Sequence, residues 1–190
     1  MDRLLHIELV TETYPPDVNG VALTVQSLEH GLRQQGHTVG IVRPQRDDES
    51  PRPDPSLMVV EGAPIPRYPG LRFGLPAGKR LAARWMAQRP DAVYIATEGP
   101  LGWSALRACR RLGIPVVTGF HTRFDDYVGR YGAGFLSPWV FSWLRRFHNK
   151  ADATLVPTRE LEDDLRQQGF RQVRRLGRAV DTRQFHPGWR

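Results

Sequence analysis

The stretch LLHIELVTETYPPDVNGVALTVQSLEHGLRQQG, residues Leu4–Gly36, gives the clearest indication of the fold class. Its first seven residues, Leu4–Val10, form a largely apolar run that is typical of a buried parallel strand. Two prolines then end the strand, and the apolar spacing of Val21–Gln35 predicts an amphipathic helix that stops at Gly36. A buried strand, a tight loop and a helix together begin an α/β unit.

The loop between this strand and this helix is a candidate anion site. Asn19 is a residue type that caps helices, and Gly20 has no Cβ to cover nearby backbone N–H groups and can adopt a positive φ. The positive end of the helix dipole favours a phosphate or a partly negative sugar oxygen there. Many α/β proteins have such a turn and bind nothing at it, so an ordinary strand-to-helix connection stays open.

The same alternation of strand and helix continues along the chain. Further strands are predicted at Thr38–Val42, Leu57–Val60, Ala92–Ile95, Val116–Thr118, Ala153–Val156 and Val173–Leu176. Further helices are predicted at Ala77–Gln88, Leu101–Leu112 and Arg159–Gln168. Repeated units of this kind predict an α/β fold with a doubly wound, mostly parallel sheet, whose ligands collect at the carboxyl ends of the strands.

The segment from Pro44 to Pro76 departs from this order because it holds half of the 16 prolines. It predicts a long surface excursion around the Leu57–Val60 strand. Within it, Gly70–Gly74 reads GLRFG and is bracketed by Pro69 and Pro76. No helix opens there, so we interpret it as a loop and not as a dinucleotide fingerprint.

Composition narrows the class of protein. The chain has 190 residues, of which 40% are hydrophobic and 25% charged, which suits one domain with one core. The single cysteine, Cys109, excludes an internal disulfide, and no signal peptide or membrane span is recognisable, so we expect a cytoplasmic location. There is no P-loop, GxSxG, HExxH or metal-spaced Cys/His cluster, so neither a cofactor nor a metal is expected.

The net charge of +7 is uneven. Residues 1–100 carry 11 basic and 12 acidic side chains, whereas residues 101–190 carry 16 and 8. The second half should therefore meet an anionic partner. Its basic residues form no recognised nucleic-acid motif, so we expect no nucleic acid, and anionic lipid head groups and sugar diphosphates fit better.

Two strand ends carry residues capable of chemistry. His121 follows the Val116–Thr118 strand, where an imidazole could hydrogen-bond a substrate hydroxyl or stabilise a developing charge. Glu98 and Gly99 follow the Ala92–Ile95 strand and could hold a hydroxyl. Each has a plainer alternative, because His121 could be an ordinary loop histidine and Glu98 an acidic residue favoured at a helix start.

The segment Pro138–Lys150 supports a different class of function. Trp139, Trp143 and Phe147 alternate with basic residues that include Arg146 and His148, so the segment could be a helix that lies on an anionic membrane. The same spacing also fits a helix packed into a core. A membrane-docking or small-molecule-binding α/β module without catalysis is therefore the alternative function.

Six motifs, in order, are similar to those of one known family. They are ETYPPDVNGVA (Glu12–Ala22), GLRQQGH (Gly31–His37), YPGL (Tyr68–Leu71), ATEGPLG (Ala96–Gly102), GFHT (Gly119–Thr122) and VPT (Val156–Thr158). Together they resemble the N-terminal half of a family 4 glycosyltransferase of the two-domain GT-B type. The similarity is greatest to GDP-mannose-dependent α-mannosyltransferases and lipid glycosyltransferases, and it covers almost the whole chain.

This resemblance implies retaining, metal-independent transfer of a mannose- or glucose-type hexose from GDP-mannose or a UDP-sugar to a lipid or glycan. The chain would bind the acceptor, a C-terminal domain would hold the nucleotide sugar, and the enzyme would be cytoplasmic or peripheral at the inner face of the membrane. His121 would be catalytic beside the transferred sugar. The expected substrate-binding residues are Asn19 and Gly20, facing the donor diphosphate, with Tyr14, Glu98, Gly99, Thr122 and Arg123.

Residues 1–176 are expected to form this Rossmann-like domain, and residues 177–190 the start of the interdomain linker. LGRAVD at Leu176–Asp181 looks like the family's connection, with Ala179 where glycine is usual. The chain has no Glu-x7-Glu pair of the family's nucleotide-binding half, so alone it is not expected to transfer sugar. Arg123, where relatives often have asparagine, leaves the acceptor open.

Overall fold

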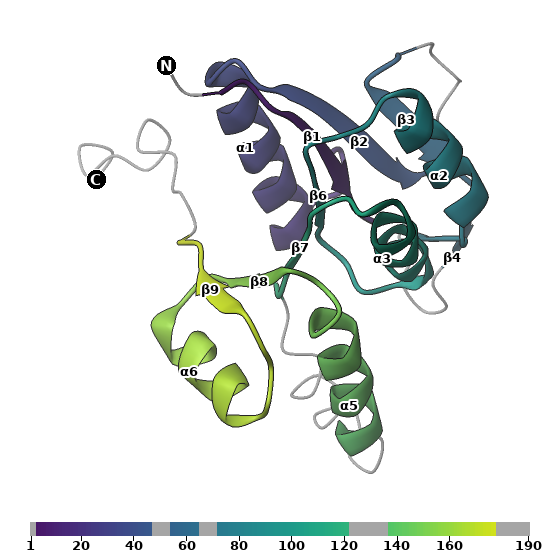
Figure 1. Ribbon diagram of the computed structural model, residues 1–190. Helices are drawn as coiled ribbons and strands as arrows, with labels where there is room; N and C mark the ends of the chain where they lie inside the picture. Colours follow the sequence, from purple (N-terminus) through teal and green to yellow (C-terminus); the bar gives the residue numbers. More distant parts are fainter. Residues whose placement is uncertain (1–2, 47–53, 65–71, 122–136, 178–190) are drawn as a thin grey trace.

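A computed structural model describes residues 3–46, 54–64, 72–121 and 137–177 and contains a seven-stranded sheet (Figure 1). Every neighbouring pair of strands is parallel, and the order is β3-β2-β1-β6-β7-β8-β9. The strands are β1 (His6–Val10), β2 (Thr38–Pro44), β3 (Leu57–Val60), β6 (Ala92–Ile95), β7 (Val116–Gly119), β8 (Ala153–Val156) and β9 (Val173–Arg175). The predicted doubly wound sheet is confirmed, and the strand order reverses between β1 and β6.

Five helices connect these strands in the described part of the chain. They are α1 (Gly20–Gln34), α2 (Gly78–Ala87), α3 (Pro100–Leu112), α5 (Ser137–His148) and α6 (Arg159–Gln167). Each was expected, with ends that agree within two residues. Gly113 ends α3 in the left-handed conformation, with a φ of 62°, as glycine readily does. Among the described helices, none has the length and apolar character needed to cross a membrane.

The helices divide between the two faces of the sheet because successive strand residues point to opposite sides. Leu9 and its partner Tyr94 face α1, together with Val25 of that helix. Val10 and its partner Ile95 point the other way, into the larger core under α2 and α3. In Figure 1, α1 lies on one side of the sheet, and α2 and α3 lie on the other. A third cluster joins α5 and α6 to β8 and β9.

One prediction for the proline-rich segment is wrong. Residues Arg72–Gly74, interpreted as loop, form β5 and pair antiparallel with β4 (Gly62–Pro64). Strands of three residues are too short to show alternation in the sequence. Their position is set by packing, since a Cβ on Gly74 would lie 2.8 Å from the Cβ of Leu101 in α3.

A buried ion pair ties α2 to the sheet. Glu8 of β1 is 1% exposed, and Nη2 of Arg84 donates to its Oε1 at 2.9 Å. Room for the carboxylate comes from Gly40 on the adjacent strand, where a Cβ would lie 2.3 Å from Oε1. A polar residue inside the first strand is thus satisfied by one arginine.

Candidate functional site

The loops that carry the predicted site residues meet at one edge of the sheet. Strands β1, β6, β7 and β8 are parallel, so the chain leaves each of them at the same carboxyl edge. The residues that follow these strands are Thr11–Asn19, Ala96–Gly99, Phe120–His121 and Pro157–Thr158. This is the edge at which ligands of doubly wound sheets bind. Thr122 and Arg123 lie outside the described residues.

Asn19 is the N-cap of α1, as predicted. Its Oδ1 accepts from the backbone N–H groups of Val21 and Ala22 at 3.1 and 2.9 Å. Its Nδ2 donates to Oγ1 of Thr13 at 2.6 Å, and that hydroxyl donates to Asp17. Both ends of the amide are therefore occupied in holding the loop, which fixes the start of α1 and the direction of its dipole.

Gly20 is exposed at the first position of α1, and a Cβ there would meet nothing within 4 Å. The described glycines with positive φ are Gly36, Gly113 and Gly169, so Gly20 does not use the freedom of glycine to adopt a positive φ. The helix simply begins at Gly20 with ordinary backbone geometry. Within the described chain neither sterics nor backbone strain requires glycine at this position.

Tyr14 packs against the α1 face of the sheet, and its hydroxyl donates to Oε2 of Glu29. Burial, followed by that carboxylate, raises the pKa of the Tyr14 phenol. Its ring also lines a small polar cavity with Arg43 and Arg72. The Tyr14 hydroxyl therefore joins the loop after β1 to α1 through this hydrogen bond.

Glu12, which was not predicted as a site residue, caps α3 from the loop after β1. Its Oε1 accepts from the N–H of Leu101 at 3.3 Å, and its own N–H donates to Oγ1 of Thr97. Burial raises the pKa of Glu12 from 4.5 to about 7, with repulsion from Glu98 adding to it and the N–H groups of Leu101 and Gly74 opposing it. A carboxyl group at this edge can therefore change protonation near neutral pH.

Gly99 is the close-approach glycine of the site. It is the N-cap of α3, and a Cβ on it would lie 2.1 Å from Oε1 of Glu12. A larger residue would displace the carboxyl group from the helix start. The packing of Glu12 therefore favours glycine at position 99. No spacing rule in the sequence indicates this contact, because the two residues are far apart in the chain.

Glu98 points into the protein. Its Oε1 is 3.2 Å from Nε2 of His148, and Nδ1 of that ring is 2.8 Å from Oγ1 of Thr118. His148 is 0% exposed, so at this residue the structure agrees with the core-packed orientation of the two that were left open for this helix. The sequence could not show this because His148 belongs to a helix whose apolar spacing fitted two orientations. The described contact of the Glu98 carboxylate is therefore with His148, which neither interpretation of Glu98 had included.

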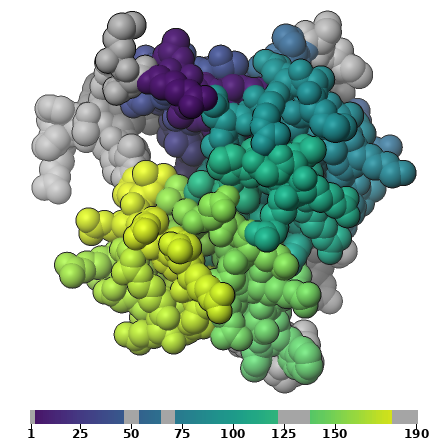
Figure 2. Space-filling view, viewed as in Figure 1, coloured from purple at the N-terminus to yellow at the C-terminus, as the bar shows by residue number. Residues whose placement is uncertain are grey.

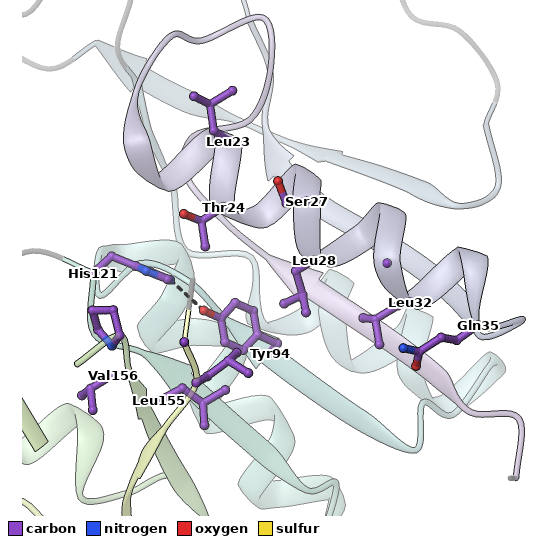
Figure 3. Close-up of a pocket in the computed structure, with 14 residues that line it drawn as sticks. Leu23, Thr24, Ser27, Leu28, Leu32, Gln35, Tyr94, His121, Leu155 and Val156 are labelled. Carbon is purple, nitrogen blue, oxygen red and sulfur yellow. Dashed lines mark hydrogen bonds between the residues drawn. The ribbon is translucent and has the colours of Figure 1, made fainter. Parts of the chain in front are cut away.

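His121 lines a groove of about 330 Å³ between α1 and the ends of β7 and β8 (Figure 3). Its Nε2 is 2.7 Å from the hydroxyl oxygen of Tyr94, which rises from β6. A Cβ on Gly119 would lie 2.1 Å from that oxygen, so glycine makes room for the pair. Thr24 of α1 also lines the groove, whose deeper walls are apolar.

The sequence profile of Glycosyltransferase Family 4 matches residues 18–184. The chain belongs to this family. The GDP-mannose-dependent alpha-mannosyltransferase of Mycobacterium tuberculosis is 32% identical over 98% of this chain and 50% of its own length. The alpha-monoglucosyldiacylglycerol synthase of Streptococcus pneumoniae is 29% identical over 84% of this chain and 36% of its own length.

The family 4 chain spans about half the length of the mannosyltransferases that it matches. Among solved structures, sucrose-phosphate synthase from Thermosynechococcus elongatus superposes with a TM-score of 0.61 at 14% identity. That match covers 94% of this chain and 49% of the synthase. A UDP-GlcNAc 2-epimerase from Methanocaldococcus jannaschii superposes with a TM-score of 0.58 at 11% identity. Likeness at this identity shows the shared fold alone.

Three groups with chemical potential therefore lie along the carboxyl edge of the sheet. They are the capped N-terminus of α1, the Glu12 carboxyl against α3, and His121 with Tyr94. A helix N-terminus favours anionic oxygens, and a paired imidazole can hydrogen-bond a sugar hydroxyl. Tyr94 was missed because it looked like an ordinary member of an apolar strand. The role of Tyr94 depends on its contact with His121, which follows the neighbouring strand β7.

Proposed function

We propose that this chain is the acceptor-side half of a retaining, metal-independent hexosyltransferase. It would transfer a mannose- or glucose-type hexose from a nucleotide-diphosphate sugar to a lipid or glycan acceptor. The nucleotide sugar would be held mainly by a second domain, reached through a linker that begins at residue 177. Membership of family 4 and matches that cover about half the length of the mannosyltransferases support this division.

The observation that carries the proposal is the position of His121. It stands at the carboxyl edge of the sheet, hydrogen-bonded to Tyr94 and lining a groove against α1. A ring held in this way can hydrogen-bond a hydroxyl of the transferred hexose and stabilise charge that develops on it. Retention further requires the acceptor oxygen to bond the anomeric carbon on the face from which the diphosphate departs.

The start of α1 is proposed to approach the donor diphosphate. The Asn19 cap fixes the loop before reaction, so the dipole needs no rearrangement as negative charge grows on the leaving group. In this proposal, helix dipoles and basic side chains of the second domain take the place of a bound cation. Gly20 is the residue at which this approach would be closest.

The proposed acceptor and location are inferred from the names of two relatives. One relative is named for an α-mannosyl transfer from GDP-mannose and another for a glucosyl diacylglycerol product. A lipid or glycan acceptor would bring the enzyme to the inner face of a membrane as a peripheral protein. We propose this location for the complete enzyme.

Calorimetry with GDP-mannose and UDP-glucose tests the division of labour. The 190-residue chain should bind both more weakly than micromolar, because the residues expected to hold the base and diphosphate belong to the second domain. Transfer by the complete enzyme should also persist in excess EDTA. Micromolar or tighter binding by this chain alone, or loss of transfer in EDTA that Mg²⁺ restores, would contradict the proposal.

A further inference from the structure

A second groove, of about 830 Å³, lies between α3 and α5, on the face of the sheet opposite the His121 groove. Figure 2 shows the green surface of α5 adjoining the teal surface of α3. Within the described chain, all the charged residues that line this groove are cationic: Arg107, Arg110, Arg111, Arg146 and Lys150. We call this the cationic groove.

Each wall of the cationic groove runs from tryptophan to basic residues. On α3, Trp103 is followed at helical spacing by Arg107 and Arg110. On α5, Trp143 is followed at helical spacing by Arg146, and Lys150 lies in the turn just after the helix ends at His148. The two indoles meet with ring centroids 5.9 Å apart, so the walls join at their aromatic ends.

The aromatic end extends to the surface through α5. Trp139 lies one turn before Trp143, and the two side chains are 78% and 43% exposed. Leu144 and Phe147 of the same helix are buried in the core. The helix therefore has a packed side and a separate, exposed tryptophan edge, a division that its sequence spacing left open.

The cations of the groove have no carboxylate partner among the described residues. Arg110 donates to the backbone oxygen of Lys150 at 2.9 Å, and the Arg107 guanidinium lies 5.8 Å from the Trp103 ring. Neither contact neutralises a charge. Like charges gathered in this way repel one another, and an anion seated between them would remove that repulsion.

We propose that the cationic groove docks the enzyme on a bilayer that contains anionic phospholipid, with lipid phosphates among the arginines. Tryptophan favours the membrane interface, where its ring is partly apolar and its N–H stays hydrated, so the edge of Trp139 and Trp143 selects a bilayer over a nucleic acid. Gly99, which lines the groove, also lies at the carboxyl edge of the sheet, where transfer is proposed to occur. This inference rests on the proposed function, because an enzyme that modifies a lipid acceptor must reach the membrane that contains it.

Vesicle flotation tests the docking. The 190-residue chain should float with phosphatidylcholine vesicles that contain 30% phosphatidylglycerol, and not with phosphatidylcholine alone. Replacing Arg107, Arg111 and Arg146 by alanine should lower the partition coefficient roughly 100-fold, since each basic residue near an anionic surface contributes several-fold. Trp139→Ala should lower it separately, and 0.5 M NaCl should release the wild type.

A matched control distinguishes binding at the cationic groove from a general effect of positive charge on the protein. Arg171, Arg174 and Arg175 are exposed on and beside β9, and their replacement by alanine removes the same charge. The inference fails if this control loses as much binding as the groove variant, or if both keep it. Equal flotation with neutral vesicles would also overturn it, as would tighter binding to a short DNA duplex than to the anionic vesicles.

The complete enzyme distinguishes failed docking from a failed functional assignment. The groove variant should lose transfer to an acceptor embedded in anionic vesicles and keep transfer to a short, soluble acceptor. If wild-type enzyme transfers hexose to neither, the proposed function is wrong, and flotation still decides the docking. If the variant uses both acceptors as well as wild type does, the docking inference is wrong.

Discussion

Nε2 of His121 lies 2.7 Å from the hydroxyl oxygen of Tyr94, across two neighbouring parallel strands. Gly119 makes this contact possible, because any Cβ at that position would occupy the space of the two side chains. Because Gly119 has no side chain, the Tyr94 hydroxyl of β6 can hydrogen-bond the imidazole of His121, which follows β7. The pair joins the fold to the proposed chemistry.

Tyr94→Phe should lower kcat/KM of the complete enzyme roughly fivefold, because the imidazole loses one orienting hydrogen bond of about 1 kcal/mol. The ring stays in the core, so the melting temperature should change little. Steady-state kinetics and a thermal melt check both. A Phe variant with unchanged kcat/KM across the pH range would show that Tyr94 does not orient His121.

Glu12 should make stability depend on pH. Its pKa is raised from 4.5 to about 7 in the folded chain, so the folded state holds the proton more tightly than the unfolded state. The associated stability is fully present below pH 4.5 and is lost as pH rises through about 7. Glu12→Gln should remove up to about 3 kcal/mol of this pH dependence.

Urea denaturation of wild type and Glu12→Gln at pH 4.5 and pH 8 measures that difference. The wild type should lose more free energy of unfolding between these pH values than the variant does. Equal losses would mean that Glu12 titrates normally in the folded protein. Asp54→Asn is a suitable control, because that carboxyl is exposed and its pKa is lowered by Ser56.

Replacing each of two glycines by alanine should affect the free energy of unfolding differently. Gly99→Ala places a Cβ 2.1 Å from the Glu12 carboxyl and should lower the free energy of unfolding by about 1–3 kcal/mol. Gly20→Ala meets nothing within 4 Å and should leave stability within about 0.5 kcal/mol. Chemical denaturation tests both, and an equally harmless Gly99→Ala would contradict the packing of Glu12 against α3.

Gly20→Val should lower transfer by the complete enzyme much more than it lowers stability. The side chain would stand at the exposed start of α1, where the donor diphosphate is proposed to approach. Gly20→Ala is the sharper test of close approach, because it adds a single methyl group. If the alanine variant retains full kcat/KM, the approach at this position is wrong and the loop is an ordinary connection.

Arg84→Met should destabilise the fold by about 3–5 kcal/mol, because it leaves the carboxylate of Glu8 buried without its partner. The double change Glu8→Gln with Arg84→Met should recover part of that loss. Denaturation of the single and double variants gives the coupling energy. Additive effects would show that the two side chains do not act as a pair.

Most strands of the main sheet could be predicted because they are short apolar runs with glycine, proline or helical segments beside them. Val10 and Ile95 illustrate this, since both end buried runs that could only be strands. The hairpin of β4 and β5 was beyond reach because its three-residue strands are held by α3 and not by their own pattern.

The candidate site was predictable only in part. Asn19 was recognisable as a cap because capping is local, and His121 because it follows a strand. The partners of site residues come from distant segments, as with Glu98 and His148, which are 50 residues apart. No local spacing could show that this carboxylate turns inward, or that Glu12 approaches Gly99.

The proposed role of His121 is measured by the kcat/KM of His121→Ala in the complete enzyme. We predict a loss of roughly 100-fold or more, in the range of a positioned acid–base or electrostatic group. The melting temperature should stay within a few degrees, and His30→Ala, an exposed histidine of α1, should keep full activity. A His121→Ala enzyme within about threefold of wild type, or one that loses folding in step with activity, would contradict the account.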